Sequence, residues 1–114
     1  MPKGIWSIIE LSNGDLIAGL GYGIIIIIGC ENELKIKNTL SEGHTKSVSS
    51  LIELENGKVV SASDSENDMI LWDLKNQSVK YIIQGHTNFI RSLAVISGNK
   101  FVSVSKDKSL KIWE

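Results

Sequence analysis

Histidine, serine and acidic residues recur together in this sequence, and a hydrolase uses these residue types as base, nucleophile and orienting acid. His44 and His86 are the only histidines, and each is followed by a Ser-x-Ser segment and then by a turn that carries acidic residues. The sequence shows neither a cluster of metal ligands nor a Gly-rich phosphate loop. Because the same set occurs twice, the repeat has to be understood before any chemistry is assigned to it.

Two copies of one unit explain the recurrence. The tripeptide Gly-His-Thr occurs at residues 43–45 and again 42 residues later at 85–87, and the two copies close at Trp72 and Trp113. When the copy that begins at residue 43 is aligned with the copy 42 residues later, nine positions carry the same residue in both. In the earlier copy these are Gly43, His44, Thr45, Ser50, Leu51, Lys58, Val60, Ser61 and Ser63. A period of this length is typical of repeat architectures.

An eroded copy precedes these two. With an offset of 43 residues, several positions near the N-terminus match the second unit. The matching residues are Ser7, Ile9, Glu10, Leu11, Asn13 and Gly14. The chain is therefore interpreted as three units.

Short apolar or alternating runs separated by turn residues fill each unit, which predicts β-strands joined by hairpins. The second unit predicts strands at 48–54, 58–63 and 69–74, and the third at 90–96, 100–105 and 110–113. Fourth strands are expected at 34–40 and 79–84. The five isoleucines at 24–28 form an unbroken apolar run, which predicts a strand covered on both faces. The pattern favours small antiparallel sheets and shows no helix signal.

Composition limits the class of protein. A chain of 114 residues with 42% hydrophobic residues is expected to form one soluble globular domain. The net charge of −1 gives no electrostatic reason to expect nucleic acid or a membrane surface as partner. The single Cys30, together with the absence of a signal peptide or transmembrane run, indicates an intracellular compartment, either cytoplasm or nucleus.

The motifs resemble those of the WD-repeat β-propeller family, in which a Gly-His pair opens the repeat, Ser-x-Ser precedes a turn with Asp, and Trp-Asp closes it. The third unit matches closely, with Glu114 in place of the final Asp, and the second ends in Trp72-Asp73. The resemblance implies an all-β fold of three propeller blades, at about 4–40, 44–84 and 86–114. The last blade lacks its outer strand.

The family resemblance also implies a structural role for the repeated polar residues. In that family His, Ser, an acid and Trp form a hydrogen-bonded chain that satisfies the buried indole. The corresponding residues are His44, Ser61, Glu66 and Trp72 in the second unit and His86, Ser103, Asp107 and Trp113 in the third. In the second unit Asp64 and Asp68 compete with Glu66. The first unit has Met1, Ala18, Tyr22 and Ile28 at these positions and has lost the network.

Three blades fall short of a ring, since propellers close with 4 to 8 blades. Either another chain or sequence beyond this one completes it. Two copies would give six blades as a homodimer with two equivalent interfaces. The alternatives are a fragment or split part of a larger propeller without independent function, and a carbohydrate-binding propeller.

The resemblance implies a protein-protein interaction scaffold that has no catalytic residue, metal or cofactor. The family commonly binds partners on the face that carries the turns before the first strand and between the second and third strands. The corresponding positions here are Trp6, Ser47, Ser49, Phe89, Arg91 and Lys106. Trp, Phe and Arg are residue types that often carry binding energy at interfaces.

Overall fold

Strands and hairpins form the part of the chain that the computed structural model describes, namely residues 4–31, 33–41 and 43–114. The first sheet contains β1 (Ile5–Glu10), β2 (Leu16–Leu20), β3 (Ile25–Gly29) and β4 (Lys35–Leu40). The second contains β5 (Ser50–Glu53), β6 (Lys58–Ala62), β7 (Met69–Asp73) and β8 (Ser78–Ile83). The third contains β9 (Ile90–Ser97), β10 (Lys100–Ser105) and β11 (Leu110–Trp113). The predicted all-β fold is confirmed.

Every sheet is an antiparallel meander in which neighbouring strands follow each other in the chain. Hairpin turns with the expected residues produce this order: Asn56 and Gly57 both have positive φ, at 62° and 73°, between β5 and β6. Such a conformation matches the twist of the flanking strands. Between β2 and β3 the chain makes a single 3-10 turn, η1 (Gly21–Gly23).

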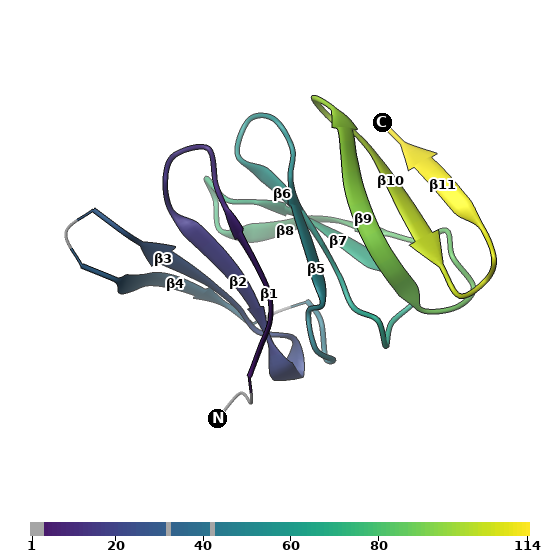
Figure 1. The fold of residues 1–114 in the computed structure, drawn as a ribbon, viewed down its shortest axis with the longest axis horizontal. Coiled ribbons are helices and arrows are strands. Elements are labelled where there is room, and N and C mark those ends of the chain that lie inside the picture. Colours follow the sequence, from purple (N-terminus) through teal and green to yellow (C-terminus); the bar gives the residue numbers. More distant parts are fainter. Residues whose placement is uncertain (1–3, 32, 42) are drawn as a thin grey trace.

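The three sheets stand beside one another in chain order, like the segments of a fan (Figure 1). The first strands of the sheets are neighbours, because β5 packs against β1 on one side and against β9 on the other. The whole assembly measures 44 × 32 × 19 Å. The described chain therefore forms an arc of three sheets, with the first and third sheets at its ends.

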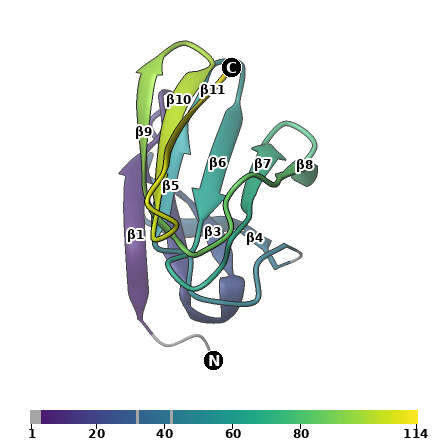
Figure 2. The same cartoon turned by 90° about the vertical axis from the view of Figure 1, so that its right-hand side faces the viewer.

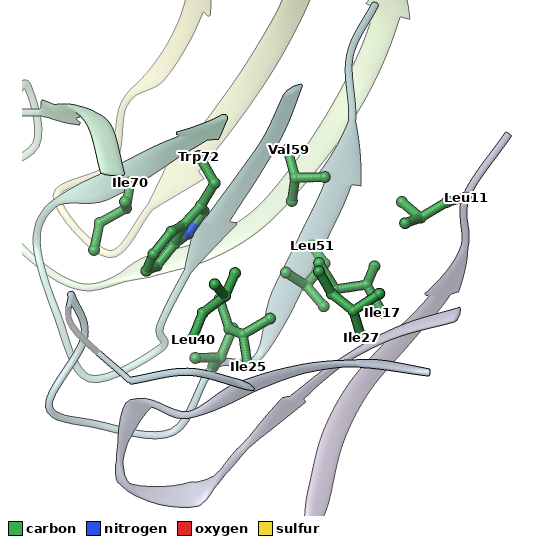
Figure 3. Close-up of a cluster of buried hydrophobic side chains, with 10 residues drawn as sticks. Leu11, Ile17, Ile25, Ile27, Leu40, Leu51, Val59, Ile70 and Trp72 are labelled. Atoms are coloured by element: carbon green, nitrogen blue, oxygen red, sulfur yellow. The ribbon is translucent and has the colours of Figure 1, made fainter. Parts of the chain in front are cut away.

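A hydrophobic cluster joins the first two sheets (Figure 3). The first sheet contributes Leu11, Ile17, Ile25, Ile27 and Leu40, and the second contributes Val48, Leu51, Val59, Ile70 and Trp72. Those on strands occupy alternate positions, such as Ile25 and Ile27 of β3 or Ile70 and Trp72 of β7, as period-2 patterning requires. Burial of this apolar surface is the main force that holds the two sheets together.

A second cluster joins the second and third sheets in the same way. Its members are Ile52, Leu54, Val60, Ala62 and Met69 of the second sheet and Ile90, Leu93 and Phe101 of the third. Trp113 packs at its margin, with its ring stacked 6.4 Å from that of Phe101. The second sheet is thus covered on both faces.

The two end sheets each keep one apolar face that no described segment covers. On the first sheet this outer face includes Ile8, which is 53% exposed, together with the half-buried Leu16, Ile26 and Ile28. On the third it includes Val102, Val104, Leu110 and Ile112, the last 60% exposed. Figure 2 views the molecule from the side of the third sheet. The isoleucine run at 24–28 is therefore packed by the described chain on one face only, where the sequence predicted cover on both.

Candidate functional site

In the third sheet, four side chains form a hydrogen-bonded chain. The indole Nε1 of Trp113 on β11 donates to Ser103 Oγ on β10 at 2.8 Å. Ser103 Oγ lies 2.7 Å from His86 Nε2, and His86 Nδ1 lies 2.8 Å from Asp107 Oδ2. His86 stands in the segment that enters β9, and Asp107 stands in the β10–β11 turn. The meander brings these distant residues together at one end of the sheet.

The second sheet carries the same arrangement. Trp72 Nε1 donates to Ser61 Oγ at 2.7 Å, and Ser61 Oγ lies 2.6 Å from His44 Nε2. The acid is Glu66, whose Oε1 lies 2.5 Å from His44 Nδ1. Of the three acids that the sequence left open, Glu66 is the one that contacts the histidine, and it also accepts from the backbone N–H of Thr45 at 3.3 Å.

The polar atoms of these chains are satisfied without any substrate. A neutral histidine with its proton on Nδ1 donates to the carboxylate, while its Nε2 accepts from the serine hydroxyl, whose oxygen in turn accepts from the indole. Ser61 and Ser103 are both fully buried. No buried side-chain nitrogen or oxygen among the described residues lacks a hydrogen-bond partner. The serines hold the tryptophans in place and present no free nucleophile.

The glycine of each Gly-His pair has a packing role that sequence analysis missed. A Cβ on Gly43 would come within 2.9 Å of Trp72 Cη2, and one on Gly85 within 2.5 Å of Trp113 Cη2. Contacts this short do not occur between real side chains, so only glycine lets the backbone lie over the indole. The signal was available, because glycine precedes the histidine in both copies.

Asp107 is the most strongly perturbed carboxyl of the third sheet. The hydrogen bond from the Ser109 hydroxyl lowers its pKa most, and His86 and the backbone N–H groups of Thr87 and Ser109 lower it further, although burial acts in the opposite direction. These donors all favour the ionised form. The carboxylate of Asp107 therefore holds both the β10–β11 turn and the ring of His86 in place.

Acid is expected to destabilise the third sheet through Asp107. Its pKa is lower in the folded chain than in the unfolded chain, where it is near the ordinary value of 3.8. As pH falls below about 4, the unfolded state binds the proton first, so the stability that Asp107 contributes is present above that pH and is lost progressively below it. Thermal unfolding from about pH 7 to pH 2 should therefore show a shallower acid decline for Asp107→Asn than for wild type. Asp64→Asn, at an exposed turn carboxylate, is the control, and parallel curves for Asp107→Asn and wild type would contradict the assignment.

The first sheet has no such chain. Ala18, where the other sheets have serine, is fully buried, and Ile28, where they have tryptophan, is half-buried. Tyr22 occupies the turn in which the acid would stand, with φ of 61° and a side chain that is 64% exposed. Met1 lies outside the described residues. Apolar packing replaces the polar network in this sheet.

One group of the expected partner-binding residues lies in a pocket between the first and second sheets. Trp6, at the start of β1 and 57% exposed, lines it together with Ser47. Tyr22, Thr45 and Lys46 line the same pocket, which has a volume of about 330 Å³. Sequence reasoning did not select these three, although the exposed aromatic in a glycine-flanked turn was a signal for Tyr22.

The remaining expected residues separate into different environments. Phe89 and Lys106 lie together on the third sheet, with the ammonium 5.4 Å from the ring centroid. Arg91 is exposed on β9. Ser49 is engaged within the second sheet, where its hydroxyl accepts from the backbone N–H of Asp64 at 2.8 Å.

Phe89 also lines a separate pocket of about 480 Å³ between the second and third sheets, beside His44, Glu66 and His86. Within the described ranges, no three metal-ligating side chains gather at one place. A membrane-spanning helix is likewise not found among those residues. The pocket that Trp6 lines offers aromatic, hydroxyl and cationic side chains, whereas the larger pocket also carries the carboxylates of Glu66 and Asp68.

Comparison with known proteins identifies the repeat. The family model described as WD domain, G-beta repeat, matches residues 77–114. Pre-mRNA-splicing factor PRP46 of Candida albicans is 31% identical over 85 residues, which cover 72% of this chain and 22% of that protein. Cell division control protein 4 of Saccharomyces cerevisiae is 32% identical over 73 residues, covering 63% of this chain and 9% of that protein.

NACHT domain- and WD repeat-containing protein 1 of Mus musculus is 30% identical over 57 residues, covering 49% of this chain and 4% of that protein. The chain thus spans between 4% and 22% of the length of these three relatives.

Proposed function

This chain belongs to the WD-repeat family, and we propose that it is a non-enzymatic protein-interaction scaffold in which two copies close a six-bladed ring. Each copy would supply three blades. Six blades fall within the range of 4 to 8 at which propellers close.

The observation that carries the proposal is the correspondence between the open faces and the packed ones. On the first sheet Ile8, Ala18 and Ile26 form one cross-strand row, and the same row in the second sheet is Leu51, Ser61 and Ile70. The second-sheet row packs against the first sheet through Leu51 and Ile70. The open face of the first sheet thus corresponds to the face of the second sheet that packs against the sheet before it.

The open face of the third sheet corresponds to the face of the second sheet that packs against the sheet after it. Its row Ala94, Val102 and Ile112 corresponds to Ile52, Val60 and Leu71. Ile52 and Val60 belong to the cluster between the second and third sheets, and Leu71 packs against it. The third sheet of one copy therefore suits the first sheet of another. Because this contact is head-to-tail, a two-fold axis gives two identical interfaces and a closed ring.

The first test is the mass of the particle. We expect twice the 12.5 kDa of the single chain by light scattering and native mass spectrometry. Ile8→Lys and Ile112→Lys place a charge on the two open faces at positions that are more than half exposed, so each should fold yet give a single-chain mass, since the lysine would be buried unpaired at the interface.

Ile82→Lys is the matched control, because Ile82 is 60% exposed but lies on the second sheet, away from both open faces. It should keep the wild-type mass. A stable, soluble wild-type monomer would refute ring closure by copies of this chain.

A scaffold function is supported by what the site offers. The two His-Ser pairs bind the indoles of Trp72 and Trp113, and Ser61 and Ser103 have no exposed surface. Exposed Trp6, Phe89 and Arg91 lie on loops or strand starts at one end of the sheets, where rigid neighbours hold them for a partner. The single, unpaired Cys30 suits a reducing, intracellular setting.

A second candidate follows from the lengths of the relatives, of which this chain spans a minor part. In that case, further blades of one longer polypeptide would cover the open faces. The chain would then be one segment of a larger propeller. A monomeric mass for this chain, combined with ring closure on adding the missing blades, would favour this candidate over the homodimer.

A further inference from the structure

We propose that Trp6, Tyr22 and Lys46 form a binding site for an acidic peptide segment of a protein partner, in which a carboxylate stands beside a proline or aromatic ring. This inference rests on the proposed scaffold function and names the partner chemistry. All three residues line one pocket between the first and second sheets of a single chain. The site is therefore complete within one copy, whatever closes the ring.

The backbone at Tyr22 is strained, and its aromatic side chain is exposed. Its φ of 61° lies in the left-handed region, which bulky residues rarely adopt. The flanking Gly21 and Gly23 are buried, and Gly23 lies so close to the backbone of His44 that it has no room for a Cβ. The turn is thus clamped against the second sheet, while the phenol points away from the core and stays 64% exposed. Strain that holds an exposed side chain in place points to a function for it.

The polar groups of the pocket are mostly free hydrogen-bond donors. Among the described residues no hydrogen bond or ion pair is formed by the indole of Trp6, the phenol of Tyr22, the ammonium of Lys46 or the hydroxyl of Ser47. The fifth polar liner, Thr45, donates through its hydroxyl to Glu66 at 3.3 Å. Glu66 itself is occupied by His44 and Thr45 and does not line this pocket.

A site with one cation, several donors and no carboxylate is complementary to an anionic acceptor. The two exposed aromatic side chains add flat apolar surface, which a proline or aromatic ring covers well. A neutral sugar donates through several hydroxyl groups, and the side-chain acceptors of the lining are limited to the hydroxyl oxygens of Tyr22, Thr45 and Ser47. A nucleic acid would need more than one cation. These features together favour an acidic peptide.

The test uses the 114-residue chain and fluorescein-labelled synthetic peptides that contain Glu-Pro or Glu-Phe, with matched peptides in which Gln or Lys replaces Glu. Binding is followed by anisotropy and by the indole N–H signals in ¹⁵N NMR spectra. Of the three tryptophans, Trp72 and Trp113 donate to serines, so the signal of Trp6 should be the one that shifts. The Glu peptides should bind at least about tenfold more tightly than the Gln peptides, and the Lys peptides more weakly still.

Three variants should weaken binding by about tenfold or more: Trp6→Ala, Tyr22→Asn and Lys46→Glu. Tyr22→Asn is diagnostic, because asparagine accepts the left-handed conformation better than tyrosine does. It should therefore unfold at the same temperature as wild type or higher, yet lose binding. Tyr81→Ala and Lys75→Glu, at an exposed tyrosine and lysine outside the pocket, are the matched controls and should bind as wild type does.

Equal binding by wild type and the three pocket variants would overturn the proposal, as would no binding of any Glu peptide up to about 1 mM. Binding of maltotriose that is lost in the same variants, without peptide binding, would replace it by a carbohydrate site. The particle mass is measured in every sample. A monomer that still binds the Glu peptides refutes ring closure alone, and a dimer that binds none refutes the peptide site alone.

Discussion

Replacing Ser61 by alanine is expected to lower the free energy of unfolding by about 3 kcal/mol, because it leaves two buried polar groups without partners. Ser61 Oγ accepts the indole N–H of Trp72 and pairs with His44 Nε2. Trp72 is only 2% exposed and His44 only 4%, so water cannot replace the lost hydroxyl. Each orphaned group costs about 1–3 kcal/mol. Denaturant unfolding monitored by far-UV circular dichroism would measure the loss.

Ser63→Ala is the matched control for this prediction. Ser63 is as buried as Ser61, but among the described residues its hydroxyl accepts only the backbone N–H of Ser65, at 3.1 Å. Its loss should cost about 1 kcal/mol. The double variant Ser61→Ala/His44→Ala should lose less than the sum of the single losses, since both residues belong to one network. Additive losses, or equal losses for Ser61→Ala and Ser63→Ala, would show that the chain from Trp72 to Glu66 is not a cooperative unit.

Gly19→Ala is expected to destabilise the chain by about 2 to 3 kcal/mol through overpacking between the first two sheets. A Cβ at Gly19 would lie 2.5 Å from the backbone oxygen of Val48 and 2.6 Å from Ser7 Oγ. That oxygen accepts the Ser7 hydroxyl at 2.8 Å, and the N–H of Val48 donates to Leu20 O at 3.1 Å. The backbone at this contact cannot move aside without breaking bonds between the sheets. Denaturant unfolding of purified Gly19→Ala would report the change.

Gly29→Ala separates this clash from the general effect of adding a methyl group to a strand. A Cβ at Gly29 would meet the side chain of Lys37, 2.8 Å away at Cδ, and this lysine can turn aside at the cost of weakening its 2.9 Å ion pair with Asp15. We expect a loss of no more than about 1 kcal/mol for this variant. If both glycine variants lost the same stability, close approach of the sheets at Gly19 would not be the cause.

These two residues act on different parts of the arc. Ser61 stabilises the interior of one sheet, where a polar chain anchors Trp72. Gly19 controls how closely the first sheet approaches the second at Val48, which follows Ser47 of the pocket that contains Trp6 and Lys46. A variant at Gly19 should therefore also disturb the proposed peptide site, whereas Ser61→Ala should leave it intact in the folded fraction.

The strands were predictable because the signals for them are local. Alternating apolar residues and turn residues such as Asn56-Gly57 act over a few positions, and they placed β10 and β11 at their observed bounds. The prediction at 48–54 was longer than β5 (Ser50–Glu53). Val48 departs because its N–H bonds to Leu20 of the neighbouring sheet and not within its own. Such a contact between sheets has no local sequence signal.

The repeat also made the polar chains predictable by comparing copies, but not the choice of acid in the second unit. Asp64, Glu66 and Asp68 all stand in the inserted turn, and sequence alone ranks them only by spacing. The path of the turn decides, because it brings the longer Glu66 side chain to His44 Nδ1 and directs its second oxygen to Thr45.

The sequence by itself determined the order of strands, the repeat and the residues that anchor Trp72 and Trp113, because these depend on periodicity and on recurrence along the chain. Only the tertiary structure decided that Trp6, Tyr22 and Lys46 share one pocket and that two apolar faces stay open. These features arise where sheets meet, and the distance between residues of different sheets follows from packing and close approach, such as that at Gly19, not from spacing along the chain.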